Sequence, residues 1–427
     1  MRVAAGKEVH MHFEKAFQSL LTKESGSPEW LLGLRRQSFE AFNTIGFPSR
    51  QNEDWKYTST RALADGDFSL PEIANVARAN LAAASLSNAS RLVFINGIYE
   101  PSQSNPPEGV EISPIDRAKI EDEAIIRSTL TSSENLALLN QAFFTSGVLI
   151  KVAKKKDLEA PIQLLYLQTE SSTPAMISPR NLIFVEAQAR VAFLESHYGE
   201  GGHFTNAVSD VFVKDGAECQ YVLERVLKPK NSFVSSHTFH VGRDARIESF
   251  NLALGGQLNR SHLVFRMTAE GASAKFDGLY IAPDQSHIDN VTEVIHLAPN
   301  TSSAQLYKGV LEGKSRAVFN GKITIVKDAQ KVDAQQLNKN LLMSADAEVD
   351  SRPQLVIDAN DVKCSHGATI GQIDSQELFY LQSRAISKDD AKRMLAKAFI
   401  GDVMGRIKHP SLRKHLETSL ENFGSRV

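Results

Sequence analysis

Cysteine is scarce in this chain, whose 427 residues include only Cys219 and Cys364. Two cysteines cannot form a disulfide framework, and they fit the reducing cytosol. The sequence also lacks an apolar run of the roughly 20 residues that a membrane-spanning helix needs. Its N-terminus has no apolar signal-peptide core, and its glutamates argue against a transit peptide. We therefore expect a cytoplasmic protein that does not bind a membrane.

An excess of basic residues is also missing, because 48 lysines and arginines face 50 aspartates and glutamates. Binding to nucleic acid requires positive charge to neutralise phosphates, so we expect no nucleic-acid partner. The chain has no Gly-x-Ser-x-Gly, His-Glu-x-x-His or Cys-x-x-Cys motif. The run Gly309-Val310-Leu311-Glu312-Gly313-Lys314-Ser315 resembles a phosphate loop but has three residues between its glycines instead of four. A strand-like run follows it where a helix is required, so we predict a β-turn and no nucleotide hydrolysis.

What the chain does contain is a repeat. Short β-branched runs dominate residues 147–381, and similar turns with a small residue recur among them. The turns follow one another at intervals of 28, 28, 27, 31 and 27 residues, at Ala189, Ala217, Ala245, Ala272, Ser303 and Gln330. A near-constant period indicates one supersecondary unit stacked on itself. A parallel β-helix fits this pattern best, and a β-sandwich is the alternative.

Helical patterns flank the repeat on both sides. We predict an N-terminal helical domain over 1–90, a β-helix core over 91–381 and a C-terminal helical domain over 382–427. The core begins with a partly helical segment around 116–144. Ser27-Pro28 is expected to cap a helix that Gly46 ends.

The C-terminal domain shows an amphipathic pattern. Ser387 and Asp390 form a capping box before a helix that glycines at 401 and 405 interrupt, and Pro410 begins a last helix. One face of the first helix is apolar, with Ala391, Met394, Leu395, Ala398 and Phe399. Such a helical pair either caps the open end of a solenoid or docks a partner, and the pattern alone leaves both open.

Several groups of polar residues outside the stretch 361–371 are candidates for metal-binding, catalytic or structural roles. His237 and His240 are three apart in a strand and face opposite sides, so they are a poor metal pair. Asp284, Asp289 and Glu293 imitate the acidic clusters of β-helix enzymes that act on polysaccharides. The amide residues of the run 335–340 are expected to stack between coils as structural groups. Cys219, alone in an alternating strand, is expected to be a small buried hydrophobic residue.

The stretch 361–371 carries the one promising metal chemistry. Cys364 and His366 are two residues apart, so in a strand they point to the same face. Thiolate and imidazole are ligands for soft metals, but one pair is half of a four-ligand site. The other half must come from elsewhere.

Several runs resemble the SufB/SufD family of iron–sulfur cluster assembly scaffold proteins. They are Phe319-Asn320-Gly321-Lys322-Ile323-Thr324-Ile325-Val326, Asp333-Ala334-Gln335-Gln336-Leu337-Asn338, Pro353-Gln354-Leu355-Val356-Ile357, Asp361-Val362-Lys363-Cys364-Ser365-His366-Gly367 and Leu378-Phe379-Tyr380-Leu381-Gln382-Ser383-Arg384. The N-terminal run Gly46-Phe47-Pro48 through Trp55-Lys56-Tyr57-Thr58 and the low cysteine count are similar to the SufD branch of this family. One departure is Ala385, where the family usually has glycine.

The resemblance implies a right-handed parallel β-helix between helical domains and a non-catalytic scaffold of the Suf system. It implies a heterodimer with SufB through the C-terminal coils, and docking of the ABC-type ATPase SufC through the helical tail. A homodimer of the isolated chain is also compatible with it. It further implies a transient iron–sulfur cluster at the SufB interface, with His366 as the favoured ligand and Cys364 as the second candidate. Flavin is a further candidate cofactor. The rival hypothesis is a solitary β-helix enzyme acting on a polysaccharide.

Overall fold

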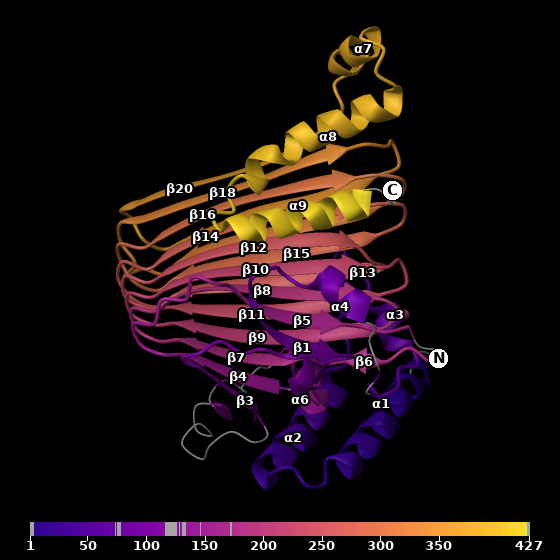
Figure 1. The fold of residues 1–427 in the computed structure, drawn as a ribbon, viewed down its shortest axis with the longest axis vertical. Coiled ribbons are helices and arrows are strands. Elements are labelled where there is room, and N and C mark those ends of the chain that lie inside the picture. Colours follow the sequence, from indigo (N-terminus) through magenta and orange to yellow (C-terminus); the bar gives the residue numbers. More distant parts are fainter. Residues whose placement is uncertain are drawn as a thin grey trace.

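A parallel β-solenoid forms the centre of the molecule in the computed structural model (Figure 1). The structure describes residues 4–72, 74, 78–115, 126–127, 129, 134–145, 147–170 and 173–424. Two ten-stranded sheets wind around a common core, and consecutive long strands alternate between them. The predicted class, a parallel β-helix between N-terminal and C-terminal helices, is confirmed, and the sandwich alternative is wrong.

The first sheet begins with a hairpin and continues as parallel strands. Its strands, in spatial order, are β2 (Ile98–Tyr99), β1 (Ser90–Ile95), β5 (Ile162–Leu167), β8 (Arg190–Gly199), β10 (Glu218–Leu227), β12 (Arg246–Gly255), β14 (Ser273–Ala282), β16 (Ser302–Leu311), β18 (Val332–Leu342) and β20 (Val362–Gln372).

The second sheet faces the first across the core. Its strands, in spatial order, are β19 (Glu348–Ile357), β17 (Arg316–Ile325), β15 (His287–His296), β13 (Leu258–Met267), β11 (Ser232–Val241), β9 (Phe204–Val213), β7 (Arg180–Val185), β4 (Gly147–Val152) and β3 (Val110–Pro114), with β6 (Met176–Ile177) beside β9.

One corner of the solenoid explains the repeat. Before each strand β8, β10, β12 and β14 a residue with positive φ turns the chain, and the next residue is an alanine that is fully buried. Only a small side chain fits where successive coils stack at this corner. The column continues at Thr301 and Val332, which come directly before the paired residues Ser302 and Asp333. They follow Asn300 and Lys331, whose φ angles are 57° and 59°. The sequence prediction of Ser303 and Gln330 for these two corners was therefore wrong.

Several turns and helix ends follow the sequence pattern, and others depart from it. Residues 309–315 form the end of β16 and a turn at Gly313 that leads to β17, so the predicted β-turn in place of a phosphate loop is confirmed. Gly46 ends its helix with φ 68°, as expected, but Ser27 donates to Glu24 rather than capping. Most of the segment 116–144 lies outside the described residues; its last part is a helix.

Helices lie at both ends of the chain. The N-terminal ones are α1 (Ala4–Lys23), α2 (Glu29–Ile45), the 3-10 turn η1 (Glu53–Trp55), α3 (Arg61–Ala64) and α4 (Arg78–Ala84); η2 (Pro101–Gln103) and α6 (Asn135–Phe143) follow within the first coils. Phenylalanines of α1, α2 and α6 pack against one another and onto the outer face of the second sheet. No helix among the described residues is long and apolar enough to cross a membrane.

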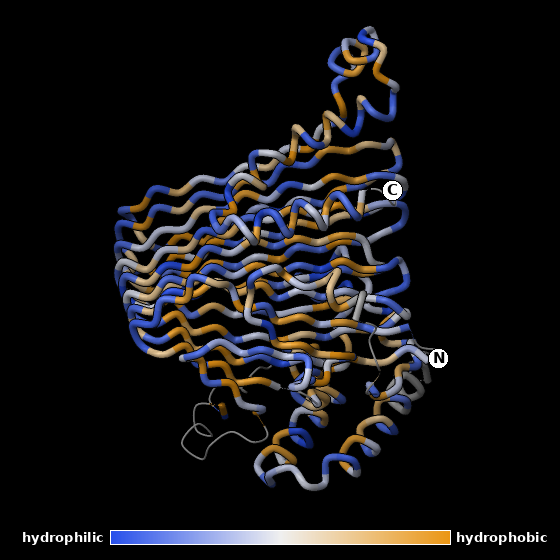
Figure 2. The backbone as a smooth tube through the Cα atoms, viewed as in Figure 1, coloured by the Kyte–Doolittle hydropathy of each residue, from blue (hydrophilic) through white to orange (hydrophobic). Residues whose placement is uncertain are grey.

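The C-terminal helices are α7 (Ser375–Ser383), α8 (Lys388–Met404) and α9 (Pro410–Gly424). Strand β20 ends at Gln372, so helical structure begins earlier than the strand-rich region predicted up to Leu381. Ser387 caps α8 through the amide of Asp390 at 3.1 Å, as predicted, but Gly401 lies inside the helix and does not interrupt it. In Figure 1 α9 lies across the outer face of the first sheet, while α7 projects beyond the last coil. Figure 2 shows apolar residues running along the strands and hydrophilic ones at the turns.

Candidate functional site at the open end of the solenoid

The last coil leaves the solenoid open. Among the described residues β20 pairs only with β18, and β19 pairs only with β17. In β19 no residue is fully buried, and most of β20 is exposed. Val356, Ile357 and Ile370 expose 40%, 38% and 49% of their surface there. An apolar, unpaired strand edge is a site at which proteins commonly add a further chain.

Cys364 and His366 both lie on this terminal strand, and the predicted common face is confirmed. In the β18–β20 register Cys364 lies above Ala334 and His366 above Gln336, and both lower residues are buried in the interior. Both side-chain positions therefore belong to the inward face of the last coil, on which no further strand of the described residues stacks. Cys364 is half-buried against Val332 and Leu355, whereas His366 is exposed.

The thiol and the imidazole differ in readiness to bind a metal. Partial burial raises the pKa of Cys364, and Asp333 adds to this, while a hydrogen bond with the backbone of Ala334 opposes it. A raised pKa disfavours the thiolate, which is the metal-binding form. Among the described residues no group of three or more His, Cys, Asp or Glu side chains is arranged to hold a metal ion. Cys364 and His366 supply two ligands at most.

The floor of the open end is polar. The amide of Gln336, directly below His366, has no hydrogen-bond partner among the described residues. It lies against Gly321 of the opposite sheet, where a Cβ would collide with it. Next to it Asn340 donates to Asn338 at 2.7 Å, and Asn338 donates to Tyr280 at 3.1 Å.

The amide run is thus structural at two of its positions. Asn338 and Asn340 stack inside, as expected, but they bond tyrosine as well as amide. Gln335 faces outward and is exposed, because it lies on the other face of β18.

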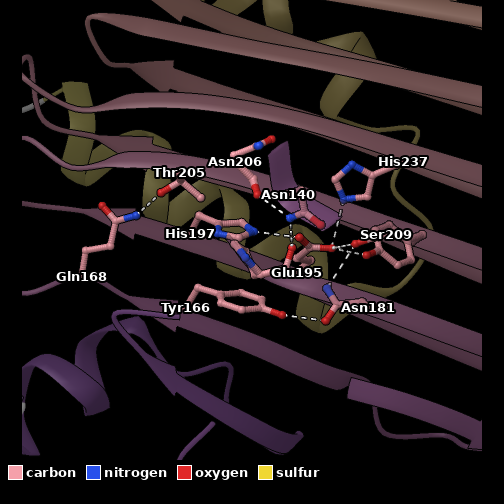
Figure 3. A network of polar contacts seen from close by, with 12 residues as sticks. Asn140, Tyr166, Gln168, Asn181, Glu195, His197, Thr205, Asn206, Ser209 and His237 are labelled. Carbon is pink, nitrogen blue, oxygen red and sulfur yellow. Dashed lines mark hydrogen bonds and ion pairs between the residues drawn. The ribbon is translucent and has the colours of Figure 1, made fainter. Parts of the chain in front are cut away.

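A second polar cluster, which sequence reasoning missed, lies deep inside the first coils (Figure 3). Glu195 is fully buried; it accepts from His197 Nε2 at 2.7 Å and from His237 Nε2 at 3.1 Å. Tyr221 also donates to this carboxylate, and Ser209 lies 3.4 Å from it. Burial alone would raise the pKa of Glu195, but the charges and hydrogen bonds of the two histidines outweigh it and hold that pKa well below its usual range.

The Glu195 cluster is sealed from solvent, so it serves the fold rather than a substrate. A signal for it existed in the sequence: Glu195 and His197 share a strand face, and His237 lies one and a half repeats further on. His240, by contrast, faces outward and stacks on Phe212 at 4.4 Å, whereas His237 is buried inside. The prediction that His237 and His240 face opposite sides of their strand is confirmed.

The acidic residues suggested for polysaccharide chemistry do not form one cluster. Asp289 is buried and paired with Arg260 beneath Thr58, and Glu293 pairs with Lys322 at 3.3 Å. Asp284 occupies a turn at φ 51°. Cys219 is 3% exposed and burial raises its thiol pKa, as predicted for a buried hydrophobic residue.

The five tail residues predicted to form one apolar face differ in how far they are buried. Ala391 is fully buried, Leu395 and Phe399 are half-buried, and Ala398 and Met394 are exposed, the latter by 50%. On α7, Phe379 and Tyr380 are 73% and 58% exposed. A shallow hollow lies between the two helices, lined by Gln376, Glu377, Tyr380, Leu381 and Leu395.

Comparison with known proteins places this geometry in a family. Residues 166–399 match the model described as SUF system FeS cluster assembly, SufBD core domain, and residues 8–164 match the SufBD protein N-terminal region. The chain belongs to the SufB/SufD family. The core match covers the solenoid from β5 into α8, including the whole open end.

Relatives agree over nearly the full length. An iron–sulfur cluster assembly SufBD family protein of Synechocystis is 29% identical, with 97% of this chain and 96% of the relative covered. The iron–sulfur cluster assembly protein SufD of Escherichia coli is 29% identical over 92% of both chains, and SufD of Bacillus subtilis is 23% identical over 99% of both. The SufB/SufD resemblance predicted from the short runs is confirmed, and the chain is an iron–sulfur cluster assembly protein of the SufD type.

Proposed function

We propose that this chain is a non-catalytic scaffold subunit that works only within a Suf complex. In this proposal SufB covers the open end, the ATPase SufC docks on the helical tail, and a nascent iron–sulfur cluster forms as cargo at the SufB interface. The observation that carries the proposal is the placement of His366 and Cys364 on the inward face of an uncovered terminal strand.

The shape of the open end supports pairing with SufB. Edge strands with exposed apolar side chains invite a partner, and natural proteins rarely leave such edges open. A relative that shares the solenoid presents the same strand spacing, so two coils can meet end to end and cover Val356, Ile357 and Ile370.

The ligand count supports a shared cluster. Iron–sulfur clusters are held mostly by four thiolates, and this end offers one half-buried thiol and one exposed imidazole. SufB must then provide the remaining ligands. His366 is the preferred ligand, or a group that hydrogen-bonds to one, because it is exposed, whereas the raised pKa of Cys364 disfavours its thiolate.

Docking of SufC is assigned to the tip of the tail. Phe379 and Tyr380 on α7 and Met394 on α8 are exposed aromatic and thioether side chains beside a shallow hollow. Aromatic residues and methionine are enriched at protein interfaces. Of the five residues predicted from the apolar pattern, Met394 and Leu395 fit this surface, whereas Ala391 is buried against the protein itself.

The test is anaerobic co-expression with SufB and SufC, followed by visible absorption of the purified complex. His366→Ala should abolish most of the cluster absorption while the complex stays intact. The matched control is Ser365→Ala, a neighbour on the same strand that faces outward and should leave absorption unchanged. Unchanged absorption with His366→Ala in an intact complex would remove this histidine from the site.

A further inference from the structure

A buried charge lies where the tail meets the solenoid. Glu224 points outward from β10, between Val222 and Val226, into the apolar cluster that receives α9. Its side chain is fully buried, and the side chain of His415 on α9 is 10% exposed. A carboxylate that is buried among apolar side chains lowers stability unless a partner charge and hydrogen bonds compensate for its lost hydration.

Three groups meet at this carboxylate. His415 Nε2 lies 3.0 Å from Glu224 Oε2, and the Tyr198 hydroxyl of β8 donates to the same oxygen at 3.0 Å. Tyr198 and His415 are 3.3 Å apart, and Ser419, one turn further along α9, also hydrogen-bonds to the carboxylate. The contact therefore joins the tail to two neighbouring strands at one point.

The rest of the tail is attached differently. Lys308 bonds Asp402 at 2.5 Å and the Phe399 carbonyl at 2.6 Å, Arg406 pairs with Asp277 at 2.8 Å, and Lys408 pairs with Glu248. In each of these pairs one partner is at least 40% exposed. Exposed pairs contribute little to stability. The contact of His415 with Glu224 differs because both partners are buried.

We propose that Glu224, His415 and Tyr198 form a protonation-dependent joint that holds α9 on the solenoid and so positions the α7–α8 tip. This inference rests on the proposed function, because the tip is the surface assigned to SufC. Helix α9 is the last helix of the tail and lies flat on the sheet (Figure 1), so loosening it weakens the anchoring of the tail that carries α8.

The sign of the pH dependence follows from both partners. Burial opposes the charge on His415, but Glu224 outweighs it and raises the pKa of His415 above its usual value. Burial likewise opposes the charge on Glu224, yet His415, Ser419 and Tyr198 hold the pKa of Glu224 below its usual value. A raised histidine pKa adds stability that is complete below about pH 6.5 and is lost as pH rises through the folded-state pKa.

Other titrating groups near the joint do not mimic this profile. Helix α9 and the corner loops enclose a groove that His415 shares with Glu170, Glu200, Lys228, Lys230 and Asp284. None of these five is a cause of the shift at His415. Burial raises the pKa of Asp277 to about 6, so the stability that this group contributes is full below its usual pKa and is lost as pH rises through about 6. Asp277 is present in both the variant and the native protein, so the ratio of their cleavage rates cancels its effect.

The test is trypsin cleavage within α9, which carries exposed Arg413 and Lys414. Rates are measured on the isolated full chain as the ratio of variant to native at each pH, because the ratio cancels the pH dependence of trypsin. His415→Gln should be cleaved about tenfold faster than native near pH 6, corresponding to about 1.4 kcal/mol. The ratio should fall as pH rises through the folded-state pKa of His415, which lies above its usual value.

Two further variants make the result decisive. His409→Gln changes a half-buried histidine just before the same helix, whose ring bonds the Glu159 carbonyl at 3.2 Å. Glutamine can keep that contact, and no carboxylate partners this ring, so the ratio should stay near one at every pH. Glu224→Gln should remove the pH dependence altogether, with circular dichroism confirming that the solenoid remains folded. A His415→Gln ratio that does not change with pH, or an equal effect of His409→Gln, would overturn the joint. Because SufC is absent from the assay, failure of SufC docking would overturn the proposed function and not this result.

Discussion

The first and last coils of the solenoid are built from similar parallel strands, but the two ends of the solenoid are covered differently. Strands β4 and β5 at the start are buried along almost their whole length. Leu31 of α2 packs there with Leu149 and Leu182, and an antiparallel strand closes each sheet. Strands β19 and β20 at the end have neither cover. One end is closed by the chain itself, and the other has no cover among the described residues.

The two cysteines lie at equivalent positions of two strands in the first sheet, and they differ in burial. Cys219 and Cys364 occupy the same inward position of the first sheet, linked through Ile247, Ala274 and the corresponding residues of β16 and β18. Cys219 has a coil above and below and is 3% exposed, whereas Cys364 has a coil on one side only. Position along the solenoid, rather than local sequence, decides which thiol can react.

The largest expected effect is therefore in thiol labelling. A maleimide should modify Cys364 at least about a thousandfold faster than Cys219, because Cys219 reacts only when its coils open, and a marginally stable domain opens in fewer than about one molecule in a thousand. Tryptic mass spectrometry of the native protein gives both rates. Comparable labelling of both cysteines would contradict the closed interior. Addition of SufB should protect Cys364 alone.

The next effect is on stability. Phe265 is fully buried and stacks with Phe239 and Phe276 at 4.7 and 4.3 Å, so Phe265→Ala should lower the free energy of unfolding by about 3–5 kcal/mol. Ile357→Ala at the open end should cost less than about 1 kcal/mol, since the side chain is 38% exposed. Urea unfolding followed by circular dichroism measures both. Equal losses would mean that the last coil is packed as tightly as the middle ones.

Much of this architecture could be predicted from the sequence, because the corner alanines are fully buried and small residues recur visibly at a fixed interval. The last two corners were misplaced by two residues each, since Thr301 and Val332 replace alanine there and neither is flanked by glycine. Common-face geometry for Cys364 and His366 followed from strand period alone.

The sequence alone could not predict which polar side chains are buried, or which elements they contact. The Glu195 cluster depends on contacts across the core between strands of opposite sheets, which local patterns do not reveal. The apolar face of α8 was predicted as one surface, yet Ala391 is buried while Met394 is exposed. Helix α8 contacts α7 as well as β14 and β16, which the pattern of one helix does not reveal. The buried role of His415 likewise required knowing that α9 lies on β10.

The smallest effect on stability should come from the tip of the tail, where the largest effect on assembly is expected. Phe379→Ser with Tyr380→Ser removes two exposed rings, so the free energy of unfolding should change by no more than about 0.5 kcal/mol. Retention of SufC in pull-downs should nevertheless fall at least tenfold if these rings are interface anchors, since aromatic anchors contribute about 2 kcal/mol or more each. Glu417→Ala, which changes another exposed side chain on α9, provides the control. Full retention of SufC by the double variant would show that the exposed tip is not its docking surface and would shift the search to the open end itself.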